Sequence, residues 1–150
     1  MYGRIVKRLA AHNFNLVNSK GYEELLASCS DDIYHRFGGD HALGGERHDK
    51  DGLRLWFERL GRLIPSLHLQ IEEMWVTGFV MNTTVIIRWT GTGEFPDGSP
   101  YLNHGVHLVR LQRGKVVSID ANEDSQAVAK MLDAVAATGV EEAHAAPILS

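Results

Sequence analysis

The sequence predicts a single α+β domain in which helices come first and an antiparallel sheet follows. Apolar residues recur at helical spacing at the start of the chain, beginning with Ile5, Val6 and Leu9. After Pro65 the apolar residues instead recur at every second position, which is the period of a strand. Short clusters of turn residues separate the later strands, and strands joined by short turns pair antiparallel. A chain of 150 residues is also a typical length for one core.

Three helices are expected before the sheet. The first covers residues 4–18 and ends at Ser19-Lys20-Gly21, and a short second helix covers residues 22–28. Asp49 or Asp51 can cap the third helix, and Pro65 ends it because the residue before a proline avoids helical geometry.

One strand is expected before this third helix and four strands after it. They are placed at residues 33–37, 67–77, 83–92, 101–112 and 115–121. Asp124 or Ser125 can cap a final helix. We expect the domain to span residues 1–138, and residues 139–150 to form a tail that is loose or that docks Ile148 and Leu149 on a neighbour.

Composition excludes several classes of protein. The net charge is −4 with no block of Lys and Arg, so nucleic acid is not expected as a partner. No stretch has the pattern of a secretory signal or a membrane span, so we expect no membrane partner and a cytoplasmic location. Cys29 is the only cysteine and lies on an apolar helix pattern, which favours plain burial. No spacing of His, Cys, Asp and Glu fits a metal site, and no cofactor motif occurs.

Four local motifs occur in a characteristic order along the chain. They are Gly44-Gly45-x-Arg47, Arg88-Trp89-x-Gly91-x-Gly93, Pro96-Asp97-Gly98 and Arg113-Gly114-Lys115-Val116. Over residues 4–135 this order resembles the SnoaL-like branch of the nuclear transport factor 2-like superfamily. The resemblance implies a conical roll of cystatin-like topology, in which three N-terminal helices pack on a strongly curved, mainly antiparallel sheet around a mostly apolar pocket.

The catalytic groups of two related enzyme classes are missing. Where ketosteroid isomerases have an aspartate base, this chain has Phe37; their oxyanion pair falls near Asn13 and His107. Limonene-epoxide hydrolases use an Asp-Arg-Asp relay. The arginine matches Arg88, but Thr90 and Ala121 replace the two carboxylates.

The other two classes leave weak candidates. The histidines of scytalone dehydratases are matched in residue type by His35 and His107, with Asn103 nearby. Polyketide cyclases of the SnoaL kind use an acid; here Asp120 is expected to face outward and Asp124 to cap a helix.

The remaining polar residues suggest a site for a small apolar carbonyl compound. The family arrangement would point Arg88 into the pocket to hold an oxyanion, although a structural ion pair with Glu73 is an equal alternative. His35 and His107 would act as acid or base, or each would be a satisfied core histidine. The expected ligand-binding residues are Asn13, Phe37, Trp56, Leu60, Trp75, Thr90, Asn103 and Ala121.

Two functions therefore stay open. The chain is either a lyase, isomerase or cyclase acting by proton transfer, or a non-catalytic binding or interaction module. A homodimer is expected in both cases, because Val85, Ile87 and Trp89 would make the outer face of the sheet apolar.

Overall fold

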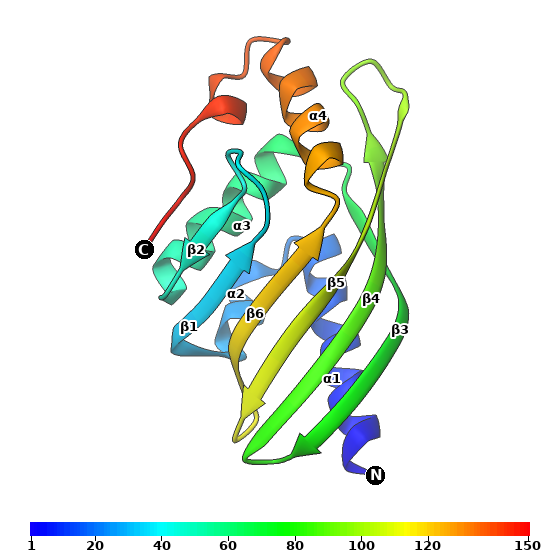
Figure 1. Ribbon diagram of the computed structural model, residues 1–150, viewed down its shortest axis with the longest axis vertical. Helices are drawn as coiled ribbons and strands as arrows, with labels where there is room; N and C mark the ends of the chain where they lie inside the picture. The colour runs from blue at the N-terminus through cyan, green and yellow to red at the C-terminus, as the bar shows by residue number, and fades with distance from the viewer.

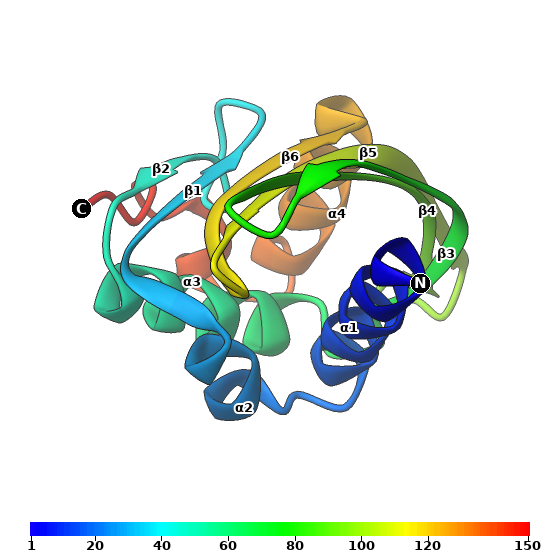
Figure 2. The same cartoon turned by 90° about the horizontal axis from the view of Figure 1, so that it is seen from below.

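The computed structural model describes residues 1–150 and has the expected α+β architecture. Four helices pack on one six-stranded sheet that does not close into a barrel (Figure 1). The helices are α1 (Tyr2–Asn18), α2 (Tyr22–Ala27), α3 (Lys50–Leu63) and α4 (Ser125–Ala136), followed by the 3-10 turn η1 (Glu141–His144). Seen along the long axis, the sheet curves over α1 and α3 (Figure 2).

The sheet has the strand order β2-β1-β6-β5-β4-β3. Its strands are β1 (Cys29–Phe37), β2 (Gly45–Arg47), β3 (His68–Phe79), β4 (Asn82–Glu94), β5 (Pro100–Gln112) and β6 (Lys115–Glu123). All neighbours pair antiparallel except β1 and β6, so the sheet is mixed. The short edge strand β2 was not predicted, because a strand of three residues carries no periodic pattern.

Side-chain caps define the starts of two helices. The carboxylate of Asp49 accepts from Gly52 N at 2.6 Å and begins α3. The carboxylate of Asp124 accepts from Gln126 N and Ala127 N and begins α4. Asp124 is therefore a helix cap, as its position in the sequence indicated.

The register of β4 corrects one prediction about the faces of the sheet. Ile87 lies directly opposite His107 on β5, and directly opposed residues share a face. Since His107 lines the interior, Val85, Ile87 and Trp89 also point inward and are buried. Arg88 and Thr90 therefore point outward, contrary to the expectation that both face the pocket. Trp75 lies opposite Ile86 on the same outer face and is 45% exposed, so it does not line the interior.

The C-terminal tail is bonded to its own chain. The carbonyl oxygen of Ile148 accepts from Arg47 at 2.6 Å, and Ser150 N donates to Glu46 O at 3.4 Å. Arg59 donates to the carbonyl oxygen of Ala146 at 2.9 Å. The tail thus lies along the free edge of β2 and covers polar backbone that an edge strand would otherwise expose.

Candidate functional site

The concave face of the sheet and the helices enclose one large apolar cavity. Its volume is about 120 Å³, and 24 of its 28 lining residues are hydrophobic. Only four lining residues are polar: Asn13, His35, Asn103 and His107. No carboxylate and no cation reaches the lining, so its polar groups are two imidazoles and two amides, together with the hydroxyl of Tyr101 and the thiol of Cys29.

His35 on β1 is backed by a buried arginine. Nε of Arg47 donates to Nδ1 of His35 at 2.9 Å, and its guanidinium also donates to the carbonyl oxygens of Gly44, Gly45 and Ile148. The side chain of Arg47 stacks near Trp56, with Cζ 5.6 Å from the ring centroid. Arg47 is 0% exposed and no carboxylate pairs with it, so its charge is buried without a counter-ion.

This arrangement fixes the protonation state of His35. A guanidinium is a donor only, so Nδ1 must be the unprotonated acceptor and the ring proton lies on Nε2. Burial holds the pKa of His35 well below its ordinary value, and the positive charge of Arg47 acts in the same direction. His35 is therefore a neutral imidazole whose Nε2–H has no acceptor in the protein.

The protonation state of His107 on β5 is fixed in the same way. The indole N–H of Trp89 donates to Nδ1 of His107 at 2.7 Å, and an indole is also a donor only. Burial lowers the pKa of His107 to about 4, while Asp120 opposes the shift. The rings of Phe14 and His107 pack edge-to-face, with their centroids 5.3 Å apart. The cavity is thus lined by two neutral histidines that each present an Nε2–H donor.

The two asparagines differ in their freedom to meet a ligand. Asn103 donates to Tyr101 Oη and Asp124 O, and its Oδ1 accepts from two backbone N–H groups. These bonds join β5 to the start of α4 and leave Asn103 a structural residue. Asn13 donates only to Ser28 Oγ, at 3.2 Å, so its carbonyl oxygen remains an available acceptor in the lining.

A second polar cluster lies where the loop after β1 meets the end of β6. Oε2 of Glu123 and Nε2 of His41 are both buried and lack partners. Ser125 donates to the other carboxylate oxygen of Glu123 at 3.0 Å. Burial raises the pKa of Glu123 to about 7, which places its titration near neutral pH. Phe37 separates this cluster from the cavity, since its ring packs on that of His41.

The structure brings together most of the residues proposed for the site from sequence. Asn13, His35, Phe37, Trp56, Leu60, Asn103 and His107 all line the cavity. Arg88, Thr90 and Trp75 do not, because they are on the outer face; Arg88 forms a surface pair with Glu73 at 3.4 Å. Ala121 is fully buried opposite His107 but lies outside the lining.

Arg47 is the site residue that sequence reasoning did not select. It belongs to the Gly44-Gly45-x-Arg47 motif, which was noted for its place in the chain and not for chemistry. Gly45 has φ = +91°, a left-handed conformation that glycine adopts without strain. Its carbonyl oxygen, together with that of Gly44, binds the guanidinium. A charged residue two positions after such a glycine pair was the available signal.

Neither a metal cluster nor a membrane-spanning helix occurs. No group of three or more His, Cys, Asp or Glu side chains could hold a metal ion. None of the helices has both the length and the apolar character needed to cross a bilayer. Cys29 lines the cavity with its thiol against the carbonyl oxygen of Leu25, and burial raises its pKa.

Comparison with solved structures gives the same fold. PrhC from Penicillium brasilianum NBRC 6234 superposes with a TM-score of 0.79 at 15% identity, covering 95% of each chain. An NTF2-like protein of unknown function from Burkholderia pseudomallei K96243 gives 0.73 at 16% identity, covering 83% of this chain and 95% of that one. A protein described as a tentative polyketide cyclase from Xanthomonas campestris pv. campestris gives 0.59 at 14% identity, covering 81% and 91%.

These identities establish the fold and not an activity. No curated protein matches the sequence significantly. The family profile of the SnoaL-like domain matches residues 10–119, which is more than half of the chain and includes the second half of α1, all of α2 and α3, and most of the sheet. The chain therefore belongs to the SnoaL-like domain family and shares its fold with NTF2-like proteins.

Proposed function

We propose that this protein binds a small, mostly apolar carbonyl compound and stabilises negative charge on its oxygen during a proton-transfer reaction of the isomerase, lyase or cyclase type. One observation carries the proposal. Arg47 is a fully buried cation without a counter-ion, and it is hydrogen-bonded directly behind an imidazole of the cavity wall. A positive charge behind His35 favours a ligand that places negative charge against the Nε2–H of His35.

The two histidines act as hydrogen-bond donors in this proposal. Nδ1 of each ring is engaged by Arg47 or Trp89, so neither ring offers a free basic nitrogen to the cavity. A neutral imidazole can still polarise a carbonyl group through its N–H. As the proton next to the carbonyl leaves, the oxygen gains charge and the Nε2–H bond strengthens, so the interaction is greatest in the transition state.

The proton acceptor is then a group of the substrate or a water molecule, because no carboxylate lines the cavity. The carbonyl oxygen of Asn13 can orient such a group. Each donor that contacts a developing oxyanion is typically worth about 10²–10³ in kcat.

A non-catalytic binding protein is the second candidate. The same lack of a carboxylate favours it, because the unprotonated nitrogen of each lining histidine already accepts a hydrogen bond from Arg47 or Trp89. In that case the cavity would hold an electronegative ligand with the same two donors but would not turn it over.

We also propose a cytoplasmic homodimer that pairs through the outer face of the sheet. The residues on this face differ from those expected, since Val85, Ile87 and Trp89 point inward. Trp75, Leu102 and Leu108 are exposed apolar residues on it, beside the surface pairs Arg88–Glu73 and Arg36–Asp120. Analytical ultracentrifugation would contradict this if only a 16.7 kDa species sedimented at micromolar concentration.

Binding of 4-nitrophenol tests the oxyanion role. Bound probe should ionise at lower pH than free probe, which is seen directly as phenolate absorbance. His35→Gln and Arg47→Met should reduce this shift, whereas Arg88→Met, which removes an exposed arginine from the outer face, should leave it unchanged. A bound probe that ionises at the same or a higher pH than in water would refute the proposal.

Hydrogen–deuterium exchange separates the two candidates. Small cyclic ketones in deuterium oxide should exchange the protons next to the carbonyl faster with the wild-type protein, and His35→Gln should lower that rate by about 10²-fold. Probe binding with no accelerated exchange across such ketones would favour the binding protein.

A further inference from the structure

Charge is strongly segregated along the chain. Three segments, residues 1–22, 74–93 and 98–119, carry eight of the 15 Lys and Arg residues and none of the 19 Asp and Glu residues. The rest of the chain is therefore strongly acidic, although the whole protein has a net charge of only −4. These basic residues form no continuous run in the sequence, because they are spread over three separate segments.

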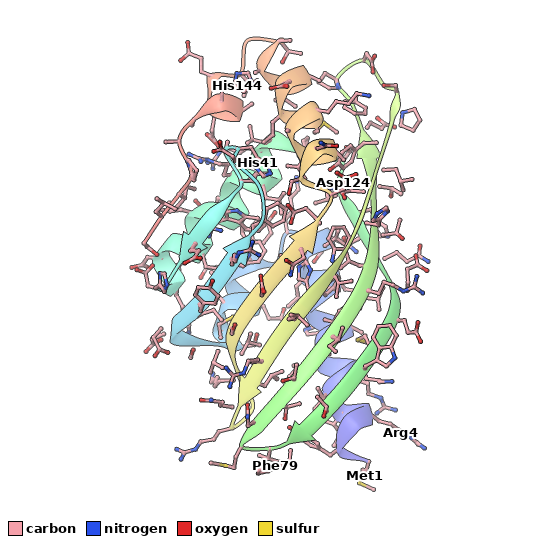
Figure 3. The ribbon with its side chains drawn as sticks, viewed as in Figure 1. Met1, Arg4, His41, Phe79, Asp124 and His144 are labelled. Carbon is pink, nitrogen blue, oxygen red and sulfur yellow. The ribbon has the colours of Figure 1, made fainter.

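The fold gathers parts of these segments at one end of the long axis. The start of α1, the β3–β4 turn and the β5–β6 turn all lie at the lower end in Figure 1 and face the viewer in Figure 2. Two contacts join them: Arg113 N donates to Val80 O at 2.9 Å, and the hydroxyl groups of Tyr2 and Thr83 are hydrogen-bonded. Figure 3 places Met1, Arg4 and Phe79 at this end.

We call this end the basic tip. Its exposed cations are Arg4, Lys7, Arg8, Arg110 and Arg113. Its exposed apolar residues are Ile5, Phe79, Val80 and Met81. Phe79 is 65% exposed, and with Val80 and Met81 it makes three consecutive apolar side chains at a hairpin turn, a place where polar residues are usual.

A groove beside the tip has the same character. It lies between α1 and β3 and is lined by Arg4 and Lys7 together with Met74, Trp75 and Val76. Trp75 is the one exposed tryptophan of the three, since Trp56 and Trp89 are buried. An indole beside basic side chains with long aliphatic stems is typical of residues at the boundary between water and lipid.

We propose that the basic tip docks this protein on the surface of an anionic lipid bilayer, with Phe79, Val80 and Met81 inserted among the head groups and the cations on lipid phosphates and carboxylates. Apolar side chains surrounded by Lys and Arg are the pattern of interfacial membrane binding. The tip protrudes as two hairpin turns and a helix end, a shape that enters a soft head-group layer.

This inference does not depend on the chemistry of the cavity. The expectation that no membrane partner exists was based on the lack of a spanning segment, and the tip concerns attachment at the surface. A bilayer also fits the cavity, because a ligand for an almost wholly apolar lining concentrates in lipid.

The test measures binding of the full chain to vesicles of phosphatidylcholine, with and without phosphatidylserine. We expect binding to the mixed vesicles only, weakening as salt is added. An increase in the shielding of Trp75 from iodide quenching when vesicles are added, relative to the lipid-free protein, reports the docked state. Arg4→Gln/Arg113→Gln should bind about 25-fold more weakly, since each basic residue near an anionic surface contributes about fivefold. Phe79→Ser/Met81→Ser should bind more weakly and leave Trp75 open to the quencher.

The control is Lys20→Gln/Lys130→Gln, which removes two exposed cations away from the tip and should bind as wild type. Circular dichroism confirms folding of each variant, whose changed residues are all exposed. Failure to bind mixed vesicles at low salt overturns the proposal, as does binding that neither tip variant weakens. Equal binding to polyglutamate, with no effect of Phe79→Ser/Met81→Ser on vesicle binding, would assign the tip to an acidic protein instead.

Discussion

Replacement of Arg47 by methionine isolates the energetics of a buried cation that has no counter-ion. The substitution keeps an unbranched apolar stem that ends near the position of Nε, and it removes donors from four acceptors: the carbonyl oxygens of Gly44, Gly45 and Ile148, and Nδ1 of His35. At about 1 kcal/mol for each bond, the lost hydrogen bonds cost about 4 kcal/mol of unfolding free energy.

A second contribution opposes this loss. Burial lowers the pKa of Arg47 to about 10, so holding the guanidinium charged in the folded protein costs up to about 3 kcal/mol. Arg47→Met removes that cost. The net destabilisation should therefore be only about 1 kcal/mol, well below the roughly 3–5 kcal/mol typical of breaking a buried ion pair.

Urea denaturation followed by circular dichroism measures this difference. Arg88→Met is the matched control, and its effect should stay within about 0.5 kcal/mol because its pair with Glu73 is exposed. A loss of about 4 kcal/mol or more for Arg47→Met would refute the reasoning, because it would mean that the charge of Arg47 is stabilised by the fold.

Three further predictions concern titration and capping. The pKa of His107 is about 4 in the folded protein, against 6.5 for a free histidine, so the unfolded chain takes up a proton first as the pH falls. The free energy of unfolding therefore decreases between pH 6.5 and pH 4, by at most about 3 kcal/mol. His107→Gln should flatten that part of the pH profile of unfolding. Glu123 has the opposite sign: its pKa is raised from 4.5 to about 7, so its carboxylate destabilises the fold as pH rises through that window. Glu123→Gln should stabilise the protein at pH 8 by about 1 kcal/mol, a figure reduced for its partial exposure, and an unchanged urea midpoint there would contradict the buried carboxylate. Asp124→Ala removes the acceptor for two N–H groups of α4 and should lower the unfolding free energy by about 1 kcal/mol in urea, whereas Asp133→Ala, on the exposed side of the same helix, should not.

Local patterns in the sequence determined the order and type of the main elements. The stripe of Leu53, Trp56, Phe57 and Leu60 gave α3 its buried face, and Asp49 and Pro65 bounded it within a residue or two. The alternation of Ile33, His35 and Phe37 also identified an inward face correctly, because the opposite face of β1 carries polar residues such as Asp32 and Arg36.

The sequence could not fix the faces of β4. Val85, Ile87 and Trp89 alternate with Thr84, Ile86 and Arg88, and both sets contain residues that suit an interior. Only pairing with β5 decides between them, because it places Ile87 opposite His107. The prediction chose the other face and therefore placed the site arginine on β4.

By itself, the sequence determined the helices, the long strands, and the two histidines and apolar side chains that line the cavity, since these follow from contacts a few residues apart. Only the tertiary structure decided which arginine backs the site and what the histidines can do. The pairing of β2 with β1 places Arg47 beside His35. The carbonyl oxygen of Ile148, near the C-terminus, accepts another hydrogen bond from the guanidinium. Trp89 reaches His107 from the neighbouring strand. A donor placed on one nitrogen of a ring sets the proton on the other, and such donors come from long-range contacts that no local pattern records.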